Sequence, residues 1–152
     1  MSTKNNLIDF PIFQVPEYQI PDNFLRGGNQ KKAMVILSSN EDTEDLNTFL
    51  AKILSAVKLD FQKDILLLSI PADEQIHLNT IARQENIITV IAFGIPPKQL
   101  GIHLSSTFYQ TTSIGSLNLL FAHSLGEIHT ERQQGGKQKA GALWRALQRL
   151  FV

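Results

Sequence analysis

Four short, nearly continuous apolar runs constrain the fold of this chain more than any other feature of its sequence. They are Ala33–Ser38, Asp64–Ile70, Ile87–Phe93 and Leu117–Ala122. Runs of this length without alternation are typical of parallel strands that are covered on both faces. Buried strands that alternate with helical segments predict a three-layer α/β/α domain. We therefore expect an α/β fold with a central, mainly parallel sheet of about four strands.

Two segments have the apolar periodicity of amphipathic helices. One follows the first run, where Asp42 or Thr43 can cap the helix and Leu46, Leu50 and Leu54 share one face. The other is Lys137–Phe151, the clearest helix of the chain. The remaining expectations are short helices within Asp73–Gln84 and at Lys98–Leu100, a loop with room for an edge strand at His103–Ser116, and an exposed loop at Gly126–Gly136.

The first 30 residues differ in composition from the rest of the chain. Pro11, Pro16 and Pro21 recur at five-residue spacing among aromatic and aliphatic residues. Proline removes backbone donors and favours extended geometry in the preceding residue, so a long helix is excluded here. We expect residues 1–30 to form an extended arm and residues 31–152 to form a single α/β domain. The arm either lies over the surface of that domain or orders on a protein partner.

Composition excludes several classes of function. The 152 residues include no cysteine, which excludes disulfides, thiolate zinc sites, iron–sulfur clusters and a thiol nucleophile. Basic and acidic residues number 14 each, so the surface as a whole is not that of a tight non-specific DNA binder. No histidine pair has zinc-binding helical spacing, and the N-terminus lacks the pattern of a signal peptide. We expect a cytoplasmic protein with no membrane contact, no metal and no cofactor.

The carboxyl ends of the predicted strands form the expected site region, because ligands bind there in open parallel sheets. Neither GxGxxG nor GxxxxGK[ST] occurs, so dinucleotide and P-loop sites are not expected. An acidic cluster, Glu41, Asp42, Glu44 and Asp45, follows the first run, and helix capping accounts for it without a ligand. His123 follows the fourth run at the mouth of this region. It is either a structural histidine or a donor to a developing anion.

The order of these elements resembles that of the uracil-DNA glycosylase superfamily. The string AMVILSSNEDTEDLNTFLAKILSAVKLDFQKDILLLSI is similar to its opening half, in which a strand, a site loop, a helix and a second strand follow one another. Phe93–Gly101 resembles the third strand and the helix after it. The closing string AHSLGEIHTERQQGGKQKAGALWRALQRLF resembles the segment in which a His-Pro-Ser motif precedes a loop and a helix. The resemblance covers about residues 32–152 and implies a uracil-DNA-glycosylase-like fold.

The resemblance carries few catalytic groups over to this chain. The first loop reads Ser38-Ser39-Asn40-Glu41, where the family has a Gly-rich motif with a group that positions water. The base-reading asparagine of the family corresponds to Ser69, which cannot make the same bidentate contact. His-Pro-Ser becomes His123-Ser124-Leu125, and the cysteines of one branch are absent. The candidate residues are Asn40, Glu41 and His123 for catalysis, and Ser39, Ser69 and Ser124 for a base pocket.

The psi subunits of bacterial DNA polymerase III are a degenerate form of this fold, and the chain resembles them in architecture. They lack glycosylase residues and contact a partner through an extended N-terminal segment. The resemblance implies a catalytically silent module that acts through protein contacts and weak DNA contacts in DNA replication or repair.

Two alternatives remain open at this point. One is a divergent active DNA glycosylase, a hydrolase that uses Asn40 or Glu41 with His123. The other is an α/β domain that binds a small ligand at the strand ends. The C-terminal helix adds cations on or near its polar face, which are either solvated or contact a DNA backbone. These cations are Lys137, Lys139, Arg145 and Arg149.

Overall fold

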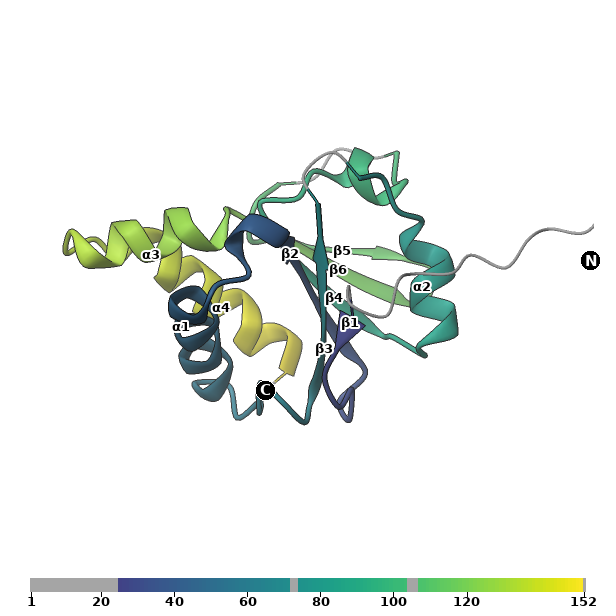
Figure 1. Cartoon of the computed structure of the whole chain (residues 1–152), viewed down its shortest axis with the longest axis horizontal. Helices are drawn as coiled ribbons and strands as arrows, with labels where there is room; N and C mark the ends of the chain where they lie inside the picture. The colour runs from purple at the N-terminus through teal and green to yellow at the C-terminus, as the bar shows by residue number, and fades with distance from the viewer. Residues whose placement is uncertain (1–24, 72–73, 104–106, 152) are drawn as a thin grey trace, which may run out of the picture.

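Six strands form one mixed sheet within the described part of the chain. The structure is a computed structural model that describes residues 25–71, 74–103 and 107–151 (Figure 1). Across the sheet the strands lie in the order β1 (Leu25–Arg26), β3 (Ile65–Ile70), β2 (Ala33–Ser38), β4 (Thr89–Phe93), β6 (Leu117–Ala122) and β5 (Thr111–Ile114).

The four apolar runs are the four central strands, and all of them are parallel to one another. β1 and β5 pair antiparallel at the two edges. The expected α/β class and mainly parallel sheet are confirmed. The sheet has six described strands rather than about four, because β1 is very short and β5 is half exposed, so neither leaves an apolar run in the sequence.

Helices cover both faces of this sheet (Figure 1). α1 (Glu44–Ser55), α3 (Leu125–Gln133) and α4 (Gln138–Phe151) lie on one face, and α2 (Leu78–Gln84) lies on the other. Successive side chains of a strand point to opposite faces, so Val35 of β2 enters the first core and Ile36 enters the second. Both are fully buried, which explains why the runs are apolar at every position.

Local sequence explains where α1 begins and which face of α4 is buried. The Thr43 side chain accepts a hydrogen bond from the Leu46 amide at 3.4 Å, so Thr43 rather than Asp42 is the N-cap of α1. In α4, Leu143 and Leu147 are fully buried against the sheet. Burial of one leucine side chain stabilises the fold by about 1.5–3 kcal/mol, so these two residues hold α4 against the sheet.

The expectation of an exposed loop over Gly126–Gly136 is wrong, because most of this segment is α3. The Ser124 hydroxyl accepts a hydrogen bond from the Glu127 amide at 3.2 Å, in the Ser-x-x-Glu pattern of a capping box. Leu125 and Ile128 are fully buried beneath the helix. The polar composition masked these two signals. The turn after α3 contains Gly135, whose φ of 89° lies in the left-handed region that suits glycine.

Residues 1–24 of the expected arm lie outside the described residues. Its last residues form the edge of the sheet: Leu25 and Arg26 pair with β3, and the Gly28 amide donates to the Gln62 carbonyl at 2.8 Å. The short helix expected within Asp73–Gln84 is α2, which begins at Leu78. Among the helices of the described ranges, none combines the length and the apolar character that crossing a bilayer requires.

Candidate functional site

The parallel strands bring the residues predicted for a site to one end of the sheet, where the carboxyl ends of the strands lie. Ser39, Asn40 and Glu41 form a 3-10 turn after β2. Ser69 is near the end of β3, and His123 follows β6. Because the four central strands run in one direction, their carboxyl ends lie at the same end of the sheet. Their side chains nevertheless divide among separate sets of contacts.

Glu41 binds the N-terminus of α3. One carboxylate oxygen, Oε1, accepts from the Leu125 amide at 2.9 Å, and Oε2 accepts from the Gly126 amide at 3.0 Å. These amides have no partner inside the helix, and a negative charge at this end is favourable. A Cβ at Gly126 would lie 2.7 Å from Oε2, so the glycine makes room for the carboxylate. Both oxygens of Glu41 are therefore committed to a structural contact.

Asp42 joins the sheet edge to the start of α1. Arg26 donates from both terminal nitrogens to its carboxylate at 2.7 and 2.6 Å, and the Asn47 amide donates at 2.8 Å. The hydrogen bonds from Arg26 lower the pKa of Asp42 to about 2 against the effect of its burial, with help from Asn47 and the Ser69 hydroxyl. Ser69, expected to line a base pocket, therefore faces this ion pair.

Asn40 and Ser39 lie on the exposed side of the 3-10 turn. The Ser38 hydroxyl hydrogen-bonds the Asn40 side-chain oxygen, which holds the amide against its own strand. A short side chain that bonds to a residue two positions away is typical of a turn. This contact gives Asn40 a local structural partner.

His123 is held by two aromatic side chains from the segment before β5. The Tyr109 hydroxyl and the Nδ1 of His123 are 2.8 Å apart, and the Phe108 ring centroid lies 4.1 Å from the imidazole. Burial is the main cause that raises the pKa of Tyr109 to about 12, and the charges of Glu127 and Glu131 contribute to this rise. The hydroxyl thus stays protonated at neutral pH. When it donates to Nδ1, Nε2 carries the proton of the neutral ring.

A cavity of about 460 Å³ lies beside His123. It is formed at the carboxyl ends of β4 and β6, with Phe108 and Glu127 at its sides. Gly94 has a φ of 67°, and a Cβ there would lie 2.7 Å from the Cβ of Ser124, so only glycine lets the two strand ends approach this closely. Of the predicted residues, His123 and Ser124 line the cavity, whereas Asn40, Glu41 and Ser69 are not among its described lining residues.

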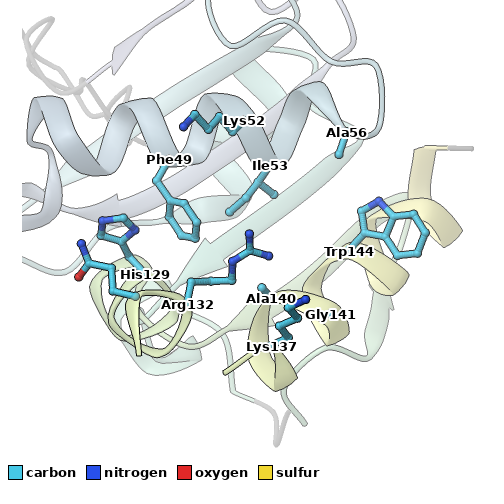
Figure 2. Close-up of a pocket in the computed structure, with 11 residues that line it drawn as sticks. Phe49, Lys52, Ile53, Ala56, His129, Arg132, Lys137, Ala140, Gly141 and Trp144 are labelled. Atoms are coloured by element: carbon cyan, nitrogen blue, oxygen red, sulfur yellow. The ribbon is translucent and has the colours of Figure 1, made fainter. Parts of the chain in front are cut away.

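A second concave region, a groove of about 570 Å³, lies on the helical side of the molecule (Figure 2). Residues of α1, α3 and α4 line it, including Phe49 and Trp144. Sequence analysis did not find this groove, because its residues come from three helices far apart in the chain. It also missed the partners of the predicted site residues, Arg26, Phe108 and Tyr109. Arg26 shares no motif with Asp42, and Tyr109 lies in a polar stretch without periodicity.

The chain matches no known family model and no curated protein sequence. Within the described ranges, no three side chains of the metal-binding types gather where they could hold an ion. What the geometry itself offers is a histidine that is hydrogen-bonded to Tyr109 beside a cavity, and acidic groups that are bound to other parts of the fold.

Proposed function

We propose that this chain is a catalytically silent module of the uracil-DNA glycosylase fold that acts through protein contacts in DNA replication or repair. The order of elements supports the proposal. After the short edge strand β1 come a strand, a loop, a helix and a second strand, and then α2 leads to a third strand with a short helical turn. The edge strand β5 precedes the last strand, β6, which is followed by His123 and two helices. This is the order on which the resemblance rests.

The hydrogen bonds of Glu41 with the start of α3 are the main support for the proposal that the module has no catalytic activity. Hydrolysis of a glycosidic bond needs a group that positions water and a pocket that holds the extruded base. Glu41 is the acidic candidate for the first task, and both of its oxygens bind the amides at the start of α3. Among described residues, the cavity with His123 is lined by neither Glu41 nor Asn40. The candidates for an active glycosylase thus do not converge on one cavity.

The test is excision of uracil from a single-stranded oligonucleotide, read as strand cleavage after alkaline treatment. We expect no cleavage above the buffer control, even with protein in excess over DNA. The matched control is His123→Ala, which should behave like the wild type. Cleavage by the wild type that His123→Ala abolishes would overturn the proposal and establish the divergent glycosylase.

Binding of a small planar ligand is a second candidate function, and the cavity beside His123 favours it. Phe108 is half exposed and lies against the imidazole, so it presents an aromatic surface at the cavity. A ligand that binds only the folded chain raises its melting temperature, so a thermal-shift screen with free nucleobases and nucleosides tests this function. A shift that Phe108→Ala removes supports it, and no shift at millimolar ligand rejects it.

We also propose that the N-terminal arm contacts a protein partner, and that contacts with DNA are weak. The arm is rich in apolar residues that would order on docking. Among the cations of α4, Lys139 is bound to Glu131 at 3.2 Å, which reduces the charge that is free for phosphates. The module therefore resembles a protein-binding unit more closely than a nucleic-acid reader.

A further inference from the structure

The groove on the helical side has an apolar floor and a tryptophan at its rim. Figure 2 shows Phe49 and Ile53 of α1 pointing toward α3 and α4, with Trp144 of α4 at one end. The rings of Phe49 and His129 of α3 pack at a tilt, with their centroids 4.6 Å apart, which fixes this wall. Trp144 retains 44% of its surface exposed, one of the most exposed large apolar side chains of the described chain. A large aromatic in that position is a typical anchor for an occupant.

The charges around the groove are all of one sign. Lys52, Arg132 and Lys137 line it, and no acidic residue is among its described lining residues. Within the part of the chain that the structure describes, none of these three cations forms an ion pair. The nearby Glu131 is bound by both the backbone and the ammonium of Lys139. The groove therefore suits an occupant that is apolar and negatively charged.

The cavity beside His123 differs in charge. It contains Glu127 and no lysine or arginine among its described lining residues. An acidic peptide would meet like charge there and opposite charge in the groove. Of these two concave regions, the groove is the one whose charge complements an acidic segment.

The first 24 residues of the chain match that chemistry in their sequence, and they lie outside the described residues. They contain three acidic residues, Asp9, Glu17 and Asp22, against a single lysine. Phe10, directly after the first acid, and Phe13 supply aromatic side chains. We propose that residues 9–22 of the chain itself occupy the groove when no partner is bound, with phenylalanine side chains against Trp144 and carboxylates beside the three cations. This docked state competes with the protein-partner contact proposed above for the same arm.

The place where the described chain begins makes this docking reachable. Leu25 pairs with Leu68 in the antiparallel strand β1, so the chain enters β1 near the carboxyl end of β3. Arg26 is bound to Asp42, which directly precedes α1 and its cap. α1 has 12 residues and a length of about 18 Å. The residues between Phe10 and Leu25 can span about 50 Å when extended, which exceeds the length of the helix.

Trp144 is the only tryptophan of the chain and reports on the groove directly. The experiment measures acrylamide quenching of its fluorescence in the chain of 152 residues at low ionic strength. In the wild type, we expect Trp144 to be shielded from acrylamide. The arm variant Asp9→Lys, Glu17→Lys, Asp22→Lys should weaken docking about tenfold and raise quenching, since each ion pair at a rim contributes modestly. Phe10→Ser with Phe13→Ser should raise quenching without a change of charge.

The groove variant Lys52→Glu, Arg132→Glu, Lys137→Glu provides the matched partner. Alone it should raise quenching, and combined with the charge-reversed arm it should restore the shielding of the wild type. Lys63→Glu with Lys98→Glu, at two exposed lysines outside the groove, is the control and should leave quenching unchanged. Circular dichroism verifies that each variant is folded.

Two results would overturn the proposal. Equal quenching in the wild type and in both arm variants would show that residues 9–22 do not cover Trp144. Shielding that disappears on dilution would assign the groove to a second copy of the chain. Uracil excision is a separate measurement, so the silent-module proposal and this docking proposal stand or fall independently.

Discussion

Asp42 lies where the loop after β2 meets the edge strand and the first helix. Arg26 reaches it from β1, and Asn47 reaches it from α1, so one carboxylate joins three elements. Its side chain is 17% exposed, and that of Arg26 is 50% exposed. A pair of this kind is partly screened by solvent, which limits its contribution to stability. The bidentate geometry compensates in part, because the planar guanidinium matches the carboxylate.

Replacement of Arg26 by glutamine tests this contact. The variant should lose about 1 kcal/mol of stability at neutral pH after allowance for screening. The pKa of the folded Asp42 is about 2, below its ordinary value of 3.8. The stabilisation is therefore present above pH 3.8 and is lost as the pH falls through about 2. The difference between wild type and variant in urea unfolding should stay constant from pH 7 down to about pH 5 and narrow as the medium is acidified below pH 3.8 toward pH 2.

Glu74→Gln is the control for this measurement. Glu74 is exposed, and its side chain has no ion pair among the described residues. Its removal should leave the unfolding midpoint unchanged at each pH. A difference between wild type and Arg26→Gln that stays constant as the pH falls below 3.8 toward 2 would contradict the assigned cause.

At the scale of elements, α3 depends on a contact from far away in the sequence. Its first amides bind Glu41, which precedes Leu125 by 84 residues, and its own Ser124 supplies the other cap. The buried face of α3 is narrow, with Leu125 and Ile128 as its fully buried residues. Capping therefore contributes a larger share of the stability of α3 than of α4, whose apolar face is broader.

Removal of the Glu41 carboxylate should loosen α3 while the sheet stays intact. Glu41→Ala leaves the Leu125 and Gly126 amides without partners, and we expect a loss of about 1–2 kcal/mol in urea unfolding. Hydrogen exchange should accelerate in the first turn of α3. Glu44→Ala serves as the comparison, because it removes an exposed carboxylate at the start of α1 that forms no ion pair with another described residue. Equal stability of wild type and Glu41→Ala would show that the cap is dispensable.

Local sequence patterns predict the central strands of the sheet, but they do not predict the edge strands, α3 or the partners of the site residues. The runs around Ile36, Leu67 and Ile91 are apolar on both faces, so their strand character and parallel pairing follow from sequence. The edge strands lack such apolar runs. The helix α3 was not predicted, because most of its residues are polar. For the site, position at the strand ends was predictable. The partners of Glu41 and His123 were not, because a side chain's hydrogen bonds depend on residues brought together only by the fold.

At the scale of the whole molecule, charge is balanced in number but not in position. The chain carries equal numbers of basic and acidic residues. Arg145 and Arg149 are both exposed and stand one helical turn apart on α4. Lys139 on the same helix is occupied by Glu131, whose pKa is lowered by its hydrogen bonds with the Lys139 backbone and side chain. Lys137, which precedes this helix, is assigned to the groove, so Arg145 and Arg149 remain as the cations of α4 without an ion pair among the described residues.

This distribution predicts weak, salt-sensitive binding to single-stranded DNA. Two phosphate contacts at about −0.7 each give a slope near −1.4 in a plot of log binding constant against log salt concentration. Fluorescence anisotropy with a labelled oligonucleotide measures the slope. Arg145→Gln should reduce its magnitude by about half, because one contact is lost. Lys139→Gln, on the same helix but paired with Glu131, should leave the slope unchanged. Equal effects of the two variants would show that the ion pair opens when DNA binds.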